Sequence, residues 1–528
     1  MRKVLLPGTL VILALLIAAA IGVQMYLNSL EPRARGRIIQ ALQERFDADV
    51  ELKSLNLSLA PVPTVVGQGL TIRHKQWSDP KPLISVTRFT AQTSLRDLVM
   101  QTDNVDLVRL EGLQIDVPPR GASAAKTQTE EQKEVGAPEA GRDTTRLRFN
   151  IRTLIADGAV LQIEPKLQGK DPLRFDIEKL TMRSVGPGQP MRFDASLQNA
   201  RPPGLINSNG RFGSWQKDDP RATPVSGAYT LQNADLGIFR GISGILSSAG
   251  SYNGVLQHIE VNGTTDTPNF ALKRGGKPVH LQISFRSVVN GMDGETMLNP
   301  VDAHFLNSEF VCRGGIIKKA SDKKKTVDLD AYTKRARMED ILRLVLGDDR
   351  PILTGEVDFK SKIVIPPGDQ DVLDKLNLNG RFKIVSARFT SAKVEQRLET
   401  LSDRARGITK SEEARQLPET IASDFFGRFL LDNGCASFSH LSFQVPGAQV
   451  KLGGTYDLRS QQIDMHGLFG MRATLSETQS GIKHWLLKPV DPFFKKDGAG
   501  FEVPLDVTGT REHPEVTVRA FHHQFTLK

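Results

Sequence analysis

Residues 54–59 read SLNLSL, with leucine at every second position and a small polar residue before each leucine. Side chains of a β-strand alternate between its two faces, so this spacing predicts a strand with one apolar face and one polar face. The same alternation recurs at Leu113, Ile115 and Val117. Such an apolar face either fills a core or serves as a binding surface, and the alternation alone favours neither.

The composition indicates a folded protein with many turns. Hydrophobic residues make up 39% of the 528 residues, and there are 45 glycines and 29 prolines. The net charge of +9 is spread thinly over 69 basic and 60 acidic residues, without a long basic run interleaved with aromatics, so nucleic acid is not an expected partner. The two cysteines, Cys312 and Cys435, fit either one long-range disulfide or two free thiols.

The first 30 residues contain the strongest targeting signal. Residues 4–23 include no charged side chain, and a helix of that length spans roughly 30 Å, the hydrocarbon core of a bilayer. Arg2 and Lys3 precede this segment. We expect an uncleaved signal-anchor with a cytoplasmic N-terminus, and a body that lies outside the cytoplasm.

Beyond the anchor, residues 31–46 predict a helix, because Ile38, Leu42 and Phe46 recur every four residues. From Val50 the period changes to two. Short strands bounded by Gly, Pro or Asp follow. Residues 119–145 lack any apolar periodicity and are predicted to be a disordered insertion.

The second half repeats a unit of turn, strand, turn and strand, as in NGRFGSW from 209 and TGEVDFKSKIVI from 354. Helices interrupt it at 338–346 and at about 392–405 and 480–487. We expect on the order of 25 strands, which side by side would extend over roughly 120 Å. Sheets of that size curl. The predicted fold is mainly β with a few helices: an N-terminal transmembrane helix, then an elongated, curled, mostly antiparallel sheet forming either a groove or a closed sandwich.

No sequence motif for catalysis or for metal binding is present. The chain lacks a GxSxG elbow, an HExxH helix and a phosphate-binding loop. We therefore predict no catalytic residues, no metal site, no cofactor and no enzymatic activity. An exported hydrolase is kept as an alternative function, and it would require a convergent polar pocket.

Two stretches resemble a known family. Residues 37–74, RIIQALQERFDADVELKSLNLSLAPVPTVVGQGLTIRH, follow the predicted anchor and resemble the N-terminal module of the AsmA-like proteins of diderm bacteria. The matching positions are Leu42, Val50 to Leu52, Leu55, Leu57, Pro61 and Gly69 to Ile72. Residues 485–518 resemble that family's C-terminal module, at Pro492, Phe493, Phe494, Gly500, Pro504, Gly509, Thr510 and Pro514.

The resemblance implies an inner-membrane anchor and a periplasmic β-groove of the bridge-like, repeating-groove type that carries phospholipid acyl chains towards the outer membrane. The implied partners are phospholipids, the inner membrane, and an outer-membrane or periplasmic protein. The chain is short for this family, which leaves open whether it bridges the periplasm alone. The alternative function, of another class, is a non-enzymatic scaffold or assembly factor for outer-membrane protein or lipopolysaccharide biogenesis.

The expected organisation has five parts: anchor 1–30, AsmA-like N-terminal module 31–118, insertion 119–145, central repetitive β-groove 146–375, and AsmA-like C-terminal module 376–528. The resemblance, rather than the alternation, favours an open groove. The residues expected to contact acyl chains are apolar and belong to the two terminal modules: Leu55, Leu57, Leu59, Leu113, Ile115, Val117, Leu441, Phe443, Val445, Val503, Leu505 and Val507.

Overall fold

The computed structural model describes residues 31–43, 48–74, 81–117, 150–163, 173–214, 220–390, 423–471 and 501–527, with short gaps inside several of these ranges. The predicted anchor, the insertion at 119–145 and the helices expected near 392–405 and 480–487 lie outside the described residues. Within the described residues, no helix is both long enough and apolar enough to cross a membrane.

The chain divides into two units. Unit 1 comprises residues 1–232 and 251–256, and unit 2 comprises residues 233–250 and 257–528. The division passes through β10 (Pro224–Asp235) and β12 (Ile245–Val255). Each unit is described separately below, and the five predicted module boundaries remain predictions.

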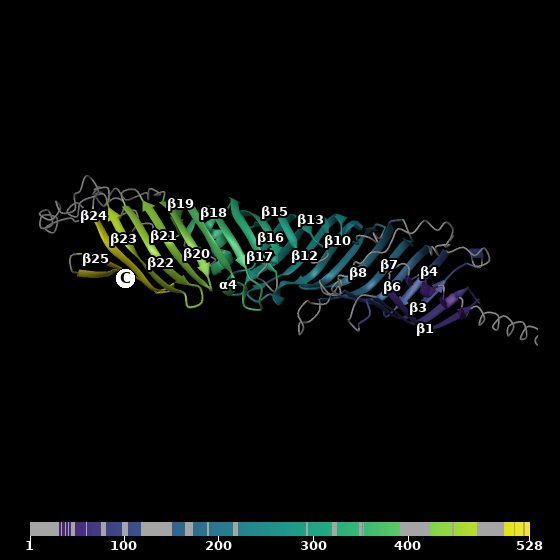
Figure 1. The fold of residues 1–528 in the computed structure, drawn as a ribbon. Coiled ribbons are helices and arrows are strands. Elements are labelled where there is room, and N and C mark those ends of the chain that lie inside the picture. Colours follow the sequence, from purple (N-terminus) through teal and green to yellow (C-terminus); the bar gives the residue numbers. More distant parts are fainter. Residues whose placement is uncertain are drawn as a thin grey trace, which may run out of the picture. The chain divides into compact units, whose positions relative to one another are not determined.

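Unit 1 is a mostly antiparallel sheet (Figure 1). Two of its described pairings are parallel, because β4 (Asn104–Glu111) and β5 (Gln114–Val117) both run alongside β6 (Asn150–Ile163) in the same direction. Its other strands are β1 (Ala48–Ser58), β2 (Thr64–His74), β3 (Ile84–Gln92), β7 (Leu173–Val185), β8 (Met191–Ala200) and β9 (Pro203–Phe212), with a 3-10 turn at Pro220–Ala222.

All of the SLNLSL stretch except Leu59 lies in β1, and the alternation of β1 changes phase once, just before this stretch. Leu52 and Leu55 are both buried although they are three residues apart, and the change occurs at Lys53. Across the strand pair, Gly69 has a φ of +65°, and a Cβ there would lie 2.6 Å from Cδ of Lys53. This local distortion lets both halves of β1 bury their apolar side chains in one core.

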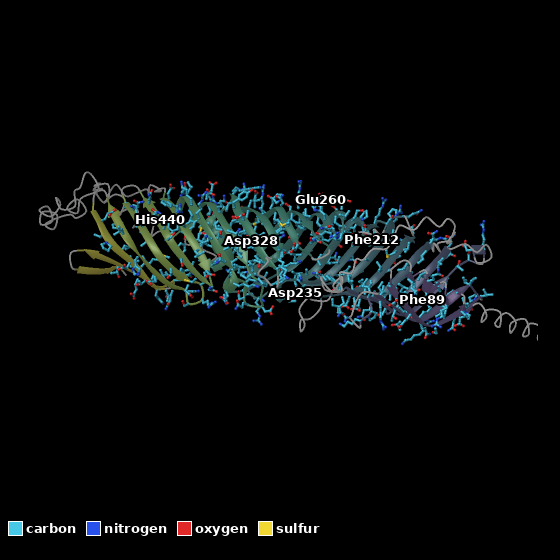
Figure 2. All side chains as sticks on the ribbon, viewed as in Figure 1. Phe89, Phe212, Asp235, Glu260, Asp328 and His440 are labelled. Atoms are coloured by element: carbon cyan, nitrogen blue, oxygen red, sulfur yellow. The ribbon has the colours of Figure 1, made fainter. Side chains whose placement is uncertain are left out.

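The core of unit 1 joins β1, β2, β3 and β6. It contains Leu55 and also Phe89, the one of the two that Figure 2 labels. The described residues between 31 and 43 are helical, in agreement with the predicted helix, and Ile38 and Leu42 pack against this core. The Arg35 guanidinium donates to the carbonyl of Leu52. The amphipathic helix thus covers the buried side of β1.

Unit 2 is an antiparallel sheet in which each strand from β13 to β26 pairs with the next (Figure 1). Its elements are a 3-10 turn at Leu236–Ile238, β11 (Ile242–Ser243), β13 (His258–Leu272), β14 (Val279–Val289), β15 (Thr296–Phe305), β16 (Ser308–Ile317), β17 (Thr326–Arg335), α3 (Met338–Leu346), β18 (Leu353–Ile365), α4 (Val372–Lys375), β19 (Asn377–Phe389), β20 (Ser423–Asp432), β21 (Cys435–Val445), β22 (Ala448–Asp457), β23 (Gln462–Met471), β24 (Phe501–Thr510), β25 (Pro514–Ala520) and β26 (His523–Leu527).

Local sequence signals account for several of these boundaries. Asn433 and Gly434, with φ values of 51° and 76°, join β20 to β21 in the turn that such dipeptides favour in hairpins. Helix α3 has the bounds predicted from the sequence and ends at Gly347, which adopts the left-handed conformation. The prediction of a mainly β fold with a curled, mostly antiparallel sheet is confirmed.

Candidate functional site

One face of the unit 2 sheet is mostly apolar. Residues paired across antiparallel strands point to the same side of a sheet, so the register places whole rows on one face. One row crosses β20 to β24 through Phe425, Phe443, Val450, Phe469 and Val503. We call the side of the unit 2 sheet that carries this row the apolar face.

Phenylalanines connect this face from strand to strand. Seven rings form an unbroken chain of contacts with centroid distances of 5.5 to 6.2 Å. We call this chain the phenylalanine ladder; in order of contact it consists of Phe305, Phe310, Phe359, Phe429, Phe382, Phe425 and Phe443. Its members come from six strands, so the ladder runs across the sheet rather than along one strand.

Most of the apolar face is half-buried. Phe443, Val450 and Phe469 are half-buried, whereas Val503 is 7% exposed. In the described part of unit 2, a buried core forms where Leu342 of α3 packs with Val357 and Ile384. Phe310, Phe359, Phe382 and Phe425 of the ladder border that core. The face therefore combines a covered segment with a long segment whose side chains stay partly accessible.

The C-terminal residues predicted to contact acyl chains are brought together on this face. Leu441 pairs with Leu452 of β22, and Phe443 pairs with Val450. β22 pairs with β23, and β23 pairs with β24. These two registers place Val503, Leu505 and Val507 of β24 on the same face as Leu441 and Phe443. Leu441 and Leu505 are buried and Val507 is half-buried. Val445 pairs with Ala448, and its side chain is outside the described atoms.

The N-terminal predicted residues lie in unit 1. Leu55 and Leu113 are buried in its core, with exposed fractions of 0% and 7%, and Ile115 packs against them. Leu57 and Leu59 are half-buried. Val117 is the last residue of β5, and its side chain is outside the described atoms. Because its exposed fraction is 0%, Leu55 has no surface that a ligand could contact.

The ladder itself was missed by the sequence reasoning, apart from Phe443. A signal existed, because Phe359, Phe382 and Phe429 each stand two residues from another inward-facing side chain in runs such as NGRFKIV. Alternation identified the faces of individual strands, and only the register shows that these rings meet.

The opposite face of unit 2 is polar and carries many ion pairs. Glu260 and Asp328, labelled in Figure 2, belong to it, and Asp328 pairs with Lys362 at 2.9 Å. The hydrogen bond to Asp328 raises the pKa of Lys362. His440 contacts Phe426 with the ring centroids 5.4 Å apart and the ring planes tilted, so this face also includes an aromatic side chain.

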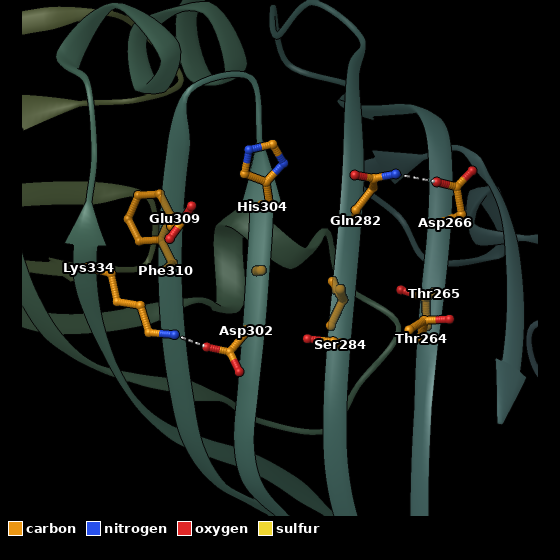
Figure 3. Close-up of a pocket in the computed structure, with 12 residues that line it drawn as sticks. Thr264, Thr265, Asp266, Gln282, Ser284, Asp302, His304, Glu309, Phe310 and Lys334 are labelled. Atoms are coloured by element: carbon orange, nitrogen blue, oxygen red, sulfur yellow. Dashed lines mark hydrogen bonds and ion pairs between the residues drawn. The ribbon is translucent and has the colours of Figure 1, made fainter. Parts of the chain in front are cut away.

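Figure 3 shows a hollow on the polar face over β13 to β17. Asp302 accepts from Lys334 at 2.5 Å, and Asp266 accepts from Gln282 at 3.3 Å. His280 also contacts Asp266, at 2.6 Å, and this hydrogen bond is the largest cause that lowers the pKa of Asp266. Lys334 pairs with Asp302 inside the hollow, whereas Asp266 pairs with His280 and Glu309 with Arg335 beside it. Each of these carboxylates has a partner and is exposed to solvent. Among the described residues, no three His, Cys, Asp or Glu side chains lie close enough together to hold a metal ion.

Both cysteines are free thiols in this structure, and both are half-buried. Cys312 pairs with Ala331 on the apolar face, and burial raises the pKa of its thiol.

Comparison of the chain with protein-family models, with curated proteins and with solved structures found no match.

Proposed function

We propose that the chain is an AsmA-like protein that binds phospholipid acyl chains on the apolar face of unit 2. The observation that carries this proposal is the apolar face itself: rows of apolar side chains cross consecutive strands, and most of these side chains stay half-buried. A monomer that only needed a core would be expected to cover such a face completely.

The free energy of burying apolar groups on this face favours acyl chains as ligands. Transfer of each methylene group from water to an apolar surface is favourable by about 0.8 kcal/mol, so a long chain gains several kcal/mol without any specific polar contact. The phenylalanine ladder offers flat rings with no polar group that needs a partner. A lipid headgroup would remain in water while its tails lie against the rings.

The cellular setting is part of the same proposal. Residues 1–30 would anchor the protein in the inner membrane by a single span, and the β body would lie in the periplasm. There it would support lipid transport to, or maintenance of, the outer membrane. The supports are the uncharged run at 4–23 and the resemblance of the two terminal stretches to AsmA-like proteins.

The test compares two phenylalanines on opposite faces. Phe443 belongs to the apolar face, and Phe426 belongs to the polar face, where it contacts His440. The full chain and the variants Phe443→Asp and Phe426→Asp would be purified, and bound lipid would be counted by native mass spectrometry and lipid extraction. We expect bound phospholipid in the wild type and in Phe426→Asp, and a strong loss in Phe443→Asp.

Circular dichroism would establish that each variant is folded. Equal lipid content in both variants would contradict the assignment of the apolar face. A folded wild-type protein without any lipid would contradict lipid binding altogether and would favour the scaffold function, in which the apolar side chains fill a core.

A further inference from the structure

The strands of unit 2 end alternately at two edges of the sheet. Because neighbouring strands are antiparallel, the connections β13–β14 and β17–β18 lie at one edge, which we call the first rim. The connection β18–β19, which contains α4, lies at the opposite edge, the second rim. The contact from the amide of Lys277 to the carbonyl of Arg343, at 3.1 Å, joins two first-rim connections and agrees with this assignment.

A set of contacts joins the two rims. Arg274, from the first rim, donates to both carboxylate oxygens of Asp374 at 2.6 and 2.8 Å, and its Nε lies 3.6 Å from Asp371. The amide of Val372 donates to the carbonyl of Arg240 at 2.9 Å. Arg240 precedes β11, which pairs with the first-rim end of β13. We call the contacts among Arg240, Arg274, Asp371, Val372 and Asp374 the clasp.

The clasp requires a strongly curled sheet. From β13 to β18 there are five strand spacings of about 4.8 Å, and strands of ten or more residues extend about 33 Å, so opposite ends would lie about 40 Å apart in a flat sheet. Instead, Arg274 and Asp374 are in hydrogen-bond contact. Rings of the ladder meet across two strands on the apolar face, as Phe359 of β18 and Phe429 of β20 do, which places that face on the concave side.

The residues of the clasp pack closely, and its charged side chains are partly buried. The side chains of Arg274, Asp371 and Asp374 are 33%, 19% and 20% exposed. Gly241 lies against Asp371, and a Cβ there would be 2.3 Å from its Oδ1. Arg459, from the β22–β23 connection at the second rim, donates to Asp374 at 2.9 Å. Asp374 thus accepts from two arginines that belong to opposite rims.

We propose that the clasp is a gate for lipid headgroups, an inference that rests on the proposed function. A lipid whose tails lie on the concave apolar face must keep its headgroup in the opening between the rims, and the clasp crosses that opening. For a phospholipid to move past it, the contact between Arg274 and Asp374 must open. A headgroup phosphate offers Arg274 and Arg459 the same kind of bidentate acceptor that Asp374 offers, so the arginines can exchange one anion for the other.

The proposal predicts a difference between lipid classes. A fatty acid has a small headgroup that need not open the clasp, whereas a phospholipid has a bulky one that must. The full chain loaded with unlabelled lipid would be mixed with vesicles containing either deuterated phosphatidylglycerol or deuterated palmitate, and exchange would be followed by native mass spectrometry. The variants are Arg274→Gln, Arg274→Lys, and a matched control, Lys334→Gln, which breaks an ion pair on the polar face of the same unit.

We expect Arg274→Gln to speed phosphatidylglycerol exchange about fivefold, the factor to which ~1 kcal/mol corresponds, and to leave palmitate exchange unchanged. Arg274→Lys should lie closer to the wild type, because it keeps the charge, and Lys334→Gln should match the wild type. Equal acceleration of both ligands, or of neither, would overturn the gate while leaving lipid binding intact. If no variant and no wild-type sample takes up either lipid, the proposed function itself fails, and the gate fails with it.

Discussion

The rings of Phe359 and Phe429 lie 5.9 Å apart although β19 separates their strands. Side chains two strands apart meet only when the sheet curves towards them, because the flat spacing of alternate strands is about 9.6 Å. On β19, Phe382 pairs with Phe359 and Gly380 pairs with Phe429. The two rings therefore meet diagonally across β19 rather than at one level of the register.

The contact between Phe359 and Phe429 predicts an energetic coupling. We expect Phe359→Ala and Phe429→Ala each to lower the free energy of unfolding by about 1–3 kcal/mol, less than at a sealed site because both rings are half-buried. The double variant should reveal a coupling of about 0.5–1.5 kcal/mol in urea unfolding. The control cycle pairs Phe359 with Phe426 on the polar face and should give no coupling. A zero value for both cycles would show that the rings do not stack in solution.

The phase change in β1 predicts unequal costs at two glycines. Gly69 and Gly158 have similar φ values, 65° and 68°, so alanine at either pays about 1–2 kcal/mol for the left-handed conformation. A Cβ at Gly158 meets nothing within 4 Å, whereas one at Gly69 meets the side chain of Lys53. Gly69→Ala should therefore cost about 1 kcal/mol more in thermal and urea unfolding.

Adding Lys53→Ala tests the origin of that difference. This second substitution removes the atoms that the new Cβ would meet, so the excess cost of Gly69→Ala over Gly158→Ala should disappear. An excess that persists in the Lys53→Ala background would place its cause elsewhere.

The sequence predicts the local periodicities of this chain well. Alternation placed Leu441 and Phe443 on one face, and the pairing of both with apolar residues of β22 agrees with this. The helix predicted at 338–346 has the same bounds as α3. These features depend on residues that are close in the sequence, within one strand or a few helical turns. A periodic pattern can predict structure only over that range.

Contacts that depend on the register between strands, or on how far the sheet curls, could not be predicted. The clasp joins Arg274 and Asp374, which are 100 residues apart, and no local pattern marks either residue. The burial of Leu55 together with Leu52 breaks the strict alternation, and its cause is the backbone at Gly69, on another strand. How far a sheet curls is a property of many strands together, so the alternation within single strands does not determine it.

The junction between β15, β16 and α3 predicts a large effect at a single carboxylate. Asp340 is 5% exposed and accepts from the Ser308 hydroxyl at 2.8 Å and from the Asn307 amide at 2.9 Å. Asp340→Ala would leave both donors without an acceptor, at a cost of roughly 2–4 kcal/mol. Urea unfolding measures the loss, and faster hydrogen exchange at the Asn307 amide would locate it. Glu309→Ala, at an exposed ion pair, should change stability by less than about 0.5 kcal/mol.

A histidine on the polar face predicts a defined pH dependence. Nδ1 of His466 lies 2.7 Å from Asp506, and Nε2 lies 2.9 Å from Asp464. The hydrogen bond to Asp506 is the largest cause that raises the pKa of His466 above its ordinary value of 6.5. Because the folded pKa is the higher one, the stabilising contribution is fully present below the unfolded pKa. It is lost as the pH rises through the folded pKa.

Nuclear magnetic resonance titration of the His466 ring measures this shift directly. We expect a midpoint above 6.5 in the wild type, a clear decrease in Asp506→Asn, and a smaller decrease in Asp464→Asn, because Asp506 makes the dominant contribution. The effect should weaken as salt is added, since the ring is exposed and its charge is screened. A larger decrease in Asp464→Asn than in Asp506→Asn would reverse the assignment and would mean that the ring pairs with its neighbour on β23 rather than with β24.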